Sequence, residues 1–289
     1  MSRTTIRSIV TSDGYRLRFR HVPAEDVRGV VVGLHGIQSH SGWYEGSSRQ
    51  LADAGFEVYF ADRRGSGLNG RRRGHADHGQ RLLHDVRQLV RLARTEHPSP
   101  QMPLAVLGIS WGGKTATVTA LEYPDLVDQL VLLTPGLCPR MGPTWWQSVQ
   151  LRFARRHDIR HRDVAVPLRD PALFTDTRRW REFIADDPLA LHYVTSGFLN
   201  AGRDLDARIA AAESRLLQPT FLALAGRDAI IDNRRTRERV DQLAAPSLMV
   251  QEYASARHTL EFEPNRRAIM DDVIRFLSWP PPQTTEQGM

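Results

Sequence analysis

The chain has 289 residues, of which 41% are hydrophobic, enough for the core of one large α/β domain with an insertion or of two small domains. No apolar run approaches the roughly 18 residues of a membrane span, and the segment Met1 to Arg7 lacks the apolar stretch of a secretory signal. The single cysteine, Cys138, excludes an intrachain disulfide and fits a reducing compartment, so we expect a cytoplasmic protein.

The net charge of +6 and the isoelectric point of about 10.0 raise the question of a nucleic-acid partner. All of the 39 basic residues except one lysine are arginines, and they are spread from Arg3 to Arg275 instead of forming a patch. No zinc-finger, helix-turn-helix or RNA-binding signature accompanies them. We therefore expect no nucleic-acid partner.

The first half of the chain alternates strands with helices after an opening hairpin. Two apolar runs, Ile6 to Val10 and Tyr15 to Val22, flank the Asp13-Gly14 turn and predict that hairpin. The continuous apolar run Val30 to Leu34 is typical of a strand buried on both faces. The elements expected next are the helix Trp43 to Ala54, the strand Phe56 to Ala61, the helix Gln80 to Glu96, the strand Pro103 to Leu107, the helix Lys114 to Glu122 and the strand Val127 to Leu133.

From Pro135 the alternation stops. Residues Gly136 to Leu217 contain no convincing strand, only short helical pieces separated by prolines. The alternation then resumes with the strand Thr220 to Ala225, the helix Asn233 to Ala244, the strand Leu248 to Tyr253 and the helix Pro264 to Trp279. The polar, proline-rich end of the chain, residues 280–289, is expected to be disordered.

This order predicts an open, mostly parallel eight-stranded sheet with helices on both faces. The predicted domains are a core formed by residues 1–135 and 218–279 and a helical cap formed by residues 136–217, inserted after the sixth strand. Ligands of such sheets bind at the carboxyl ends of the strands. The side chains that carry the chemistry should therefore cluster there.

A serine stands at the apex of a sharp turn between a predicted strand and a predicted helix, in Gly108-Ile109-Ser110-Trp111-Gly112. A turn this sharp holds the apex residue in a strained backbone conformation and exposes its hydroxyl above the end of the sheet. The flanking glycines allow the strand and the helix to approach each other. The arrangement suits a nucleophilic serine.

The same segment, Gly108 to Thr115, also fits the phosphate-loop pattern, in which Lys114 would contact phosphates and Thr115 would hold magnesium. A phosphate loop needs an apolar strand, usually downstream, that ends in an acidic residue. The strand Val127 to Leu133 ends in Thr134-Pro135 instead. We therefore favour the nucleophilic serine.

A nucleophilic serine needs a base and an acid that orients the base. Among eleven histidines, His258 lies between the last predicted strand and the last predicted helix, from where it can reach over the sheet edge towards Ser110. Asp228 follows the preceding strand and is the expected acid. Asp232 is its rival, but its place before Asn233 better fits a helix N-cap. The order Ser, Asp, His is the one expected for a hydrolase of this architecture.

Two backbone N–H groups must face the oxyanion of a tetrahedral intermediate. The Trp111 N–H, at the start of the helix after Ser110, is one expected donor. The other is the Ile37 N–H, in the loop after the strand Val30 to Leu34. Gly36 allows the backbone to come close, and His35 is expected to have a structural role.

Further segments complete a family pattern. Leu34 to Tyr44 is close to a His-Gly segment with a following His-Ser and aromatic-Tyr, and Asp62 to Gly67 is similar to an Asp-x-x-Gly-x-Gly turn. With the serine turn and the Arg257-His258 loop, the chain resembles α/β-hydrolases of the monoacylglycerol lipase and lysophospholipase type, a group that includes serine aminopeptidase-like sequences. The resemblance spans roughly Val30 to Leu277. It implies an α/β-hydrolase fold, a Ser110–Asp228–His258 triad, oxyanion donors at Ile37 and Trp111, and no metal or organic cofactor.

The predicted cap is rich in aromatic side chains, of which Trp145, Trp146 and Phe198 are expected to line an acyl-binding pocket. The segment Thr144 to Arg156 is expected to form an amphipathic basic helix. Because such a helix can rest on an anionic lipid surface, we hypothesise a transient membrane contact through the cap, with the protein cytoplasmic or peripheral at the membrane.

These features predict a serine hydrolase that cleaves carboxylic esters, with monoacylglycerols or lysophospholipids as the first candidates. An amide or peptide hydrolase such as an aminopeptidase would use the same triad, and a cap carboxylate, from Glu182 or Asp186, would favour it by binding the substrate amine. The third alternative is a binding protein that keeps the fold without the chemistry. The sequence leaves the acyl length, the head group and the oligomeric state open.

Overall fold

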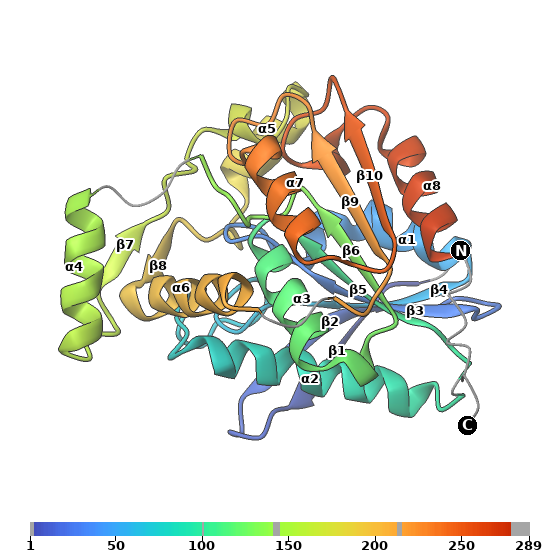
Figure 1. Cartoon of the computed structure of the whole chain (residues 1–289), viewed down its shortest axis with the longest axis horizontal. Helices are drawn as coiled ribbons and strands as arrows, with labels where there is room; N and C mark the ends of the chain where they lie inside the picture. The colour runs from blue at the N-terminus through green and yellow to red at the C-terminus, as the bar shows by residue number, and fades with distance from the viewer. Residues whose placement is uncertain (1–2, 100, 141–144, 213–215, 279–289) are drawn as a thin grey trace.

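The computed structural model describes residues 3–99, 101–140, 145–212 and 216–278, and for residues 145–150 it describes the backbone alone (Figure 1). Eight strands form one sheet in the order β1-β2-β4-β3-β5-β6-β9-β10. β1 and β2 pair antiparallel, as do β2 and β4, and all other pairs are parallel. The strands are β1 (Thr5–Val10), β2 (Arg16–Val22), β3 (Gly29–Leu34), β4 (Phe56–Ala61), β5 (Leu104–Ile109), β6 (Gln129–Leu133), β9 (Thr220–Ala225) and β10 (Leu248–Tyr253). The predicted mostly parallel eight-stranded sheet is confirmed.

The continuous apolar runs of the sequence have a simple origin, because every residue of β3, β4, β5, β6 and β9 is buried. Helices cover both faces of these strands. α1 and α8 pack against each other, as do α2 and α3, while α7 lies against β9. The helices are α1 (Glu45–Asp53), α2 (Gly79–Glu96), α3 (Trp111–Glu122), α7 (Asn233–Gln242) and α8 (Arg266–Leu277).

The segment between β6 and β9 contains α4 (Trp145–Arg156), β7 (Asp163–Ala165), η3 (Pro171–Leu173), α5 (Arg178–Asp186), β8 (Tyr193–Thr195) and α6 (Ser196–Ala210). Of these elements, α4, β7, β8 and α6 lie at the left of Figure 1, and α5 lies near its top above α7. β7 and β8 pair antiparallel, so the expectation of no strand in this segment was wrong. Strands of three residues are too short to give a readable alternation of polar and apolar residues.

Two helix starts differ from the prediction. The helix expected from Trp43 begins as a 3₁₀ turn, η1 (Ser41–Tyr44), and continues as α1. α3 begins at Trp111, directly after Ser110, which is three residues before the predicted stretch Lys114 to Glu122 and agrees with the expected place of the Trp111 N–H at the helix start. The tail predicted to be disordered, residues 280–289, lies outside the described residues. No helix in the described part of the chain is long and apolar enough to cross a membrane.

Candidate active site

Ser110 occupies the sharp turn between β5 and α3. Its backbone has φ 50° and ψ −122°, in the region of positive φ that a residue with a Cβ enters only under strain. The turn depends on a close approach at Gly112, where an added Cβ would lie 2.3 Å from the carbonyl oxygen of Leu34. β3 and α3 can therefore pack this closely only if this position lacks a side chain.

The structure brings Ser110, His258 and Asp228 together. His258 Nε2 lies 2.8 Å from Ser110 Oγ, and His258 Nδ1 lies 2.8 Å from Asp228 Oδ2. All three side chains are buried. A serine, an imidazole and a carboxylate in this hydrogen-bonding sequence can move the serine proton to the histidine as the hydroxyl attacks a carbonyl.

Asp228 is held as a carboxylate. Burial alone would raise the pKa of this group, but the charge and hydrogen bond of His258, with the N–H groups of Ile231 and Ile230, outweigh burial and lower the pKa. An ionised Asp228 accepts the Nδ1 proton of His258, which leaves Nε2 free to accept the proton of the Ser110 hydroxyl. Asp232, the rival acid, instead caps α7 by accepting a hydrogen bond from the Arg235 N–H.

The two expected oxyanion donors lie beside Ser110. A Cβ added at Gly36 would stand 3.2 Å from the Ser110 Cβ, so the loop that carries Ile37 closely approaches the serine. Neither the Ile37 N–H nor the Trp111 N–H has a hydrogen-bond acceptor among the described residues. Two N–H groups beside a buried serine that donate to no described protein group can donate to a negative charge that develops on a substrate oxygen.

Ser110, Ile37 and Trp111 open into a mostly apolar cavity of about 280 Å³, the Ser110 cavity. Part of its wall comes from the segment between β6 and β9, including Leu151 of α4 and Leu199 of α6. Lys114 also faces the cavity, but its Nζ lies 2.6 Å from Asp206. The lysine that the phosphate-loop pattern would use is therefore neutralised by a carboxylate.

A family model described as serine aminopeptidase, S33, matches residues 25–265. The chain belongs to this family. Among its relatives, the S33 chain is 27% identical over 264 residues to a monoacylglycerol lipase of Mycolicibacterium smegmatis, which covers 88% of this chain and 90% of the relative. It is 29% identical over 246 residues to lysophospholipase L2 of Escherichia coli K12, with 77% and 70% covered.

Solved structures agree with the fold of the S33 chain. A soluble variant of the monoglyceride lipase of Saccharomyces cerevisiae, in complex with a substrate analog, superposes with a TM-score of 0.82 over 96% of this chain and 95% of that one, at 18% identity. A monoacylglycerol lipase of Paleococcus ferrophilus gives a TM-score of 0.78 over 95% and 98%, at 20% identity. The α/β-hydrolase fold predicted from the sequence is confirmed.

Three aromatic residues of the S33 chain were expected to line the substrate pocket. Phe198 does not reach the Ser110 cavity, because its ring is buried in a stack on Trp111, with ring centroids 4.6 Å apart, and its neighbour Leu199 forms the wall. Trp145 and Trp146 belong to α4, but their side chains lie outside the described part of the structure. Within the described residues, no three His, Cys, Asp or Glu side chains gather as a metal site would require.

Two further residues contact the loop after β3 and carry no recognisable signal in the sequence. The guanidinium of Arg63 contacts the backbone carbonyls of the loop that carries Ile37. The carboxylate of Asp187, from the segment between β6 and β9, accepts hydrogen bonds from His40 and Trp43 further along the same loop. Because these contacts join segments far apart in the chain, no local pattern could have predicted them.

Proposed function

We propose that this protein hydrolyses carboxylic esters of lipids through an acyl-enzyme on Ser110. One observation carries the proposal: an unbroken hydrogen-bonding sequence from Ser110 through His258 to Asp228 opens into a mostly apolar cavity. The apolar walls suit an acyl chain, and the two unpaired N–H groups suit the carbonyl oxygen of an ester. Relatives named as lipases and lysophospholipases support the same assignment.

The proposed reaction has two halves. His258 Nε2 takes the proton of Ser110 as its Oγ attacks the ester carbonyl, and the Ile37 and Trp111 N–H groups stabilise the resulting oxyanion. The intermediate then breaks its bond to the alcohol oxygen, which receives the proton from His258. Water attacks the acyl-enzyme while His258 takes a proton from it, and the acid leaves as Ser110 regains its proton.

The substrate class that we propose is a monoacylglycerol or a lysophospholipid. A cavity of about 280 Å³ has room for a sizeable part of an acyl chain. Rates on p-nitrophenyl esters of increasing chain length, measured beside a lysophospholipid and an aminoacyl amide, decide between these classes. A preference for medium or long acyl chains supports the proposal, and faster cleavage of the amide contradicts it.

The described residues offer no feature in favour of an aminopeptidase. The two carboxylates that would have favoured one, Glu182 and Asp186, are exposed on α5 and do not line the Ser110 cavity, and Glu182 pairs with Arg178 at 2.7 Å. Among the described residues the carboxylate that does line the cavity is Asp206, which Lys114 neutralises. A substrate ammonium group would therefore find no free counter-charge there.

Replacement of Ser110 by alanine tests the proposal directly. The S110A variant should lose about a million-fold in kcat, as comparable serine hydrolases do, because the variant has no nucleophile. It should also fail to react with a fluorophosphonate probe that labels the wild-type protein. Ester hydrolysis by S110A at a rate near that of the wild type would contradict the mechanism, and absence of labelling in the wild type would favour a binding protein without this chemistry.

A further inference from the structure

Arg63 follows β4 and sends its guanidinium to the loop that carries Ile37. Its Nη1 donates a hydrogen bond to the carbonyl oxygen of Gly36 and its Nη2 donates one to the carbonyl oxygen of Ile37, both at 3.0 Å. The Nδ1 of His35 also donates to the Gly36 carbonyl, at 2.7 Å. Its Nε2 accepts a hydrogen bond from the backbone N–H of Arg63, at 2.9 Å, which fixes this tautomer.

The Gly36 carbonyl and the Ile37 N–H belong to the same peptide unit. In a planar trans peptide the C=O and the N–H point in opposite directions. A cation that holds the carbonyl oxygen therefore fixes the direction of the N–H on the other side of the plane. It also draws electron density towards the oxygen, which makes the N–H a stronger donor. Gly36 lies against Ser110, so the peptide unit that carries the Ile37 N–H is next to the serine.

Arg63 also contacts the second donor segment. Its guanidinium carbon lies 5.0 Å from the centre of the Trp111 ring and 4.7 Å from the centre of the Phe198 ring. Trp111 is the residue whose backbone N–H is the other expected oxyanion donor. One side chain thus joins the loop after β3 to the start of α3, the two segments that must keep a fixed distance for both donors to reach one oxygen atom.

The charge of Arg63 is not neutralised by an ion pair. Among the described residues no carboxylate lies within 4 Å of its guanidinium. Arg63 keeps some accessible surface, but burial lowers its pKa, and the Asp62 carboxylate offsets part of this effect. The arginine remains protonated at neutral pH. Its Nε is enclosed and has no acceptor in the part of the chain that the structure describes. Burial of a cation whose hydrogen-bond acceptors are carbonyls costs desolvation free energy. A neutral side chain that only filled this space would not have this cost.

We propose that Arg63 is the positioning residue of the oxyanion hole, which holds the Gly36–Ile37 peptide so that its N–H points at the oxyanion formed on Ser110. This inference rests on the proposed function. Arg63 should contribute to catalysis when negative charge develops on the substrate oxygen, and its contribution should be small when the neutral substrate binds.

The test compares Arg63 with its neighbour Arg64. The guanidinium of Arg64 bonds to the carboxylates of Asp85 and Asp13 and makes no contact with the loop that carries Ile37, so R64M is a matched control. The variants R63M, R63Q and R63K are purified beside it, and circular dichroism and Tm report their folding. R63K and R63Q keep a side chain that can donate a hydrogen bond, and they remain informative if R63M does not fold.

Two readouts separate positioning from packing. The first is the division of the effect between kcat and KM on a p-nitrophenyl ester, and the second is the rate at which a fluorophosphonate labels Ser110, a reaction that also places negative charge on an oxygen. For R63M we expect kcat and the labelling rate to fall together by about 10- to 100-fold with KM little changed, since a misdirected donor costs up to what a missing one does. R63K should recover part of both rates, and R64M should lower Tm with both rates near wild type.

Each other outcome overturns the inference. Wild-type kcat and labelling rates in R63M remove the positioning role, and equal losses in R64M and R63M reduce it to packing of the turn. A loss confined to KM would make Arg63 a contributor to ground-state binding instead. If the wild-type protein itself is not labelled at Ser110, the proposed function fails and this inference fails with it, whereas labelled wild type with unaffected Arg63 variants rejects this inference alone.

Discussion

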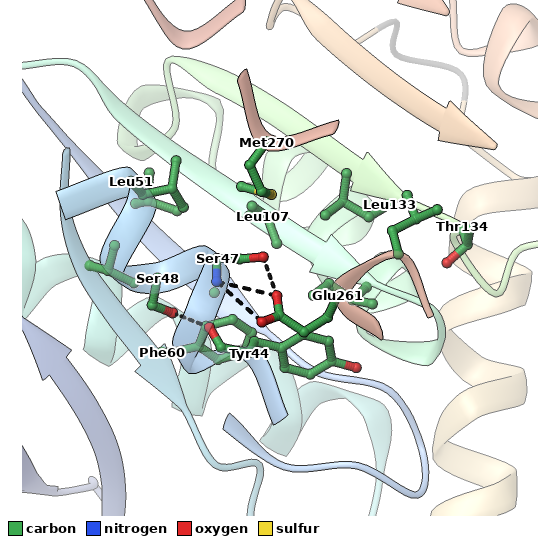
Figure 2. A pocket seen from close by; sticks show the side chains of 15 residues that line it. Tyr44, Ser47, Ser48, Leu51, Phe60, Leu107, Leu133, Thr134, Glu261 and Met270 are labelled. Atoms are coloured by element: carbon green, nitrogen blue, oxygen red, sulfur yellow. Dashed lines mark hydrogen bonds between the residues drawn. The ribbon is translucent and has the colours of Figure 1, made fainter. Parts of the chain in front are cut away.

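Glu261 lies three residues after His258, in the turn η4 (Leu260–Phe262), and its carboxyl enters a small cavity between the sheet and helix α1 (Figure 2). The backbone N–H and the hydroxyl of Ser47, at the start of α1, donate hydrogen bonds to it. The other walls of this cavity are mostly apolar, with Leu51, Leu107 and Met270 among them. Burial therefore raises the pKa of Glu261 to about 7, although its hydrogen bonds and Arg266 oppose the rise.

The raised pKa predicts a dependence of stability on pH. An acid whose pKa is higher in the folded than in the unfolded chain contributes stability that is fully present below its unfolded pKa and is lost as the pH rises through its folded pKa. For Glu261 the window runs from its ordinary value of 4.5 to about 7. The side chain is 6% exposed, so the loss reaches up to ~3 kcal/mol above this window.

The variant E261Q should remove this dependence, because the amide keeps the shape and an acceptor oxygen for Ser47 without a charge that titrates. Urea unfolding at pH 8.5 should show E261Q more stable than the wild type by up to ~3 kcal/mol, and at pH 4.5 the two should nearly coincide. The exposed Glu252, changed to Gln, is the control. Parallel stability profiles of E261Q and the wild type between these two pH values would contradict the assignment.

The residues of the candidate site were predictable to different degrees. Ser110 could be predicted because glycines on both sides mark its turn, and His258 and Asp228 could be predicted because each directly follows a strand of a parallel sheet. Arg63 could not be predicted, because its partners are backbone carbonyls far upstream. Every residue has such a carbonyl, so the side chains at those positions give no indication of the contact. Phe198 was expected at the substrate because aromatic side chains favour apolar pockets in general, but its ring packs against Trp111 and Arg63 instead.

At the scale of elements, the strands of the main sheet were predicted best. β4, β9 and β10 have the predicted bounds, and the other strands of the sheet differ by a few residues at their ends. The short strands β7 and β8 were missed because only their pairing in three dimensions distinguishes three residues of strand from a loop. Packing over long distances, not local propensity, decides such elements.

Helix α4 is the element that we propose contacts a lipid surface. In its last two turns Leu151 and Ala154 are buried and Leu151 lines the Ser110 cavity, whereas Phe153 is 57% exposed with exposed arginines on either side of it in the chain. An exposed phenylalanine among cations suits an anionic membrane, where the ring enters the acyl region and the cations meet the head groups. From such a position the same helix would join the membrane to the cavity wall.

Phe153 provides the test of this contact. The variant F153S should bind phosphatidylglycerol vesicles about tenfold more weakly than the wild type in sedimentation, because it loses the burial of one aromatic side chain. Binding by both proteins should weaken as salt is added. V10S is the matched control, since Val10 is 66% exposed on the distant strand β1. Equal vesicle binding by F153S and the wild type would reject α4 as the contact.

At the scale of the whole molecule, Asp187 joins the segment between β6 and β9 to the sheet. Its Oδ2 accepts hydrogen bonds from the Trp43 Nε1, at 2.6 Å, and from the His40 Nε2, at 3.1 Å. Nearby, the N–H of Leu191 donates to the carbonyl of Gln38, at 2.9 Å. These contacts lie on the loop after β3, so the segment over the Ser110 cavity and the loop that carries Ile37 form one connected unit.

The stability that Asp187 contributes to this connection depends on pH. Burial alone would raise the pKa of its carboxyl, but the hydrogen bonds from His40, Trp43 and the Leu189 N–H outweigh burial and lower it. An acid with a lowered folded pKa contributes stability that is present above its unfolded pKa and is lost as the pH falls through the folded value. The contribution is therefore complete at neutral pH and decreases in acid.

The variant D187N should consequently lose stability and activity together. An amide is a weaker acceptor for two N–H donors, and its own NH₂ group cannot satisfy either, so we expect a loss of about 1–3 kcal/mol in the free energy of unfolding at pH 7. The difference from the wild type should shrink as the pH falls below 4. D186N, at the exposed neighbouring position, should leave both properties unchanged.

Because His40 and Trp43 lie on the same loop as Ile37, kcat should fall in D187N even at temperatures where the variant remains fully folded. Retention of wild-type kcat under those conditions would mean that the segment over the cavity can loosen without disturbing the oxyanion donors.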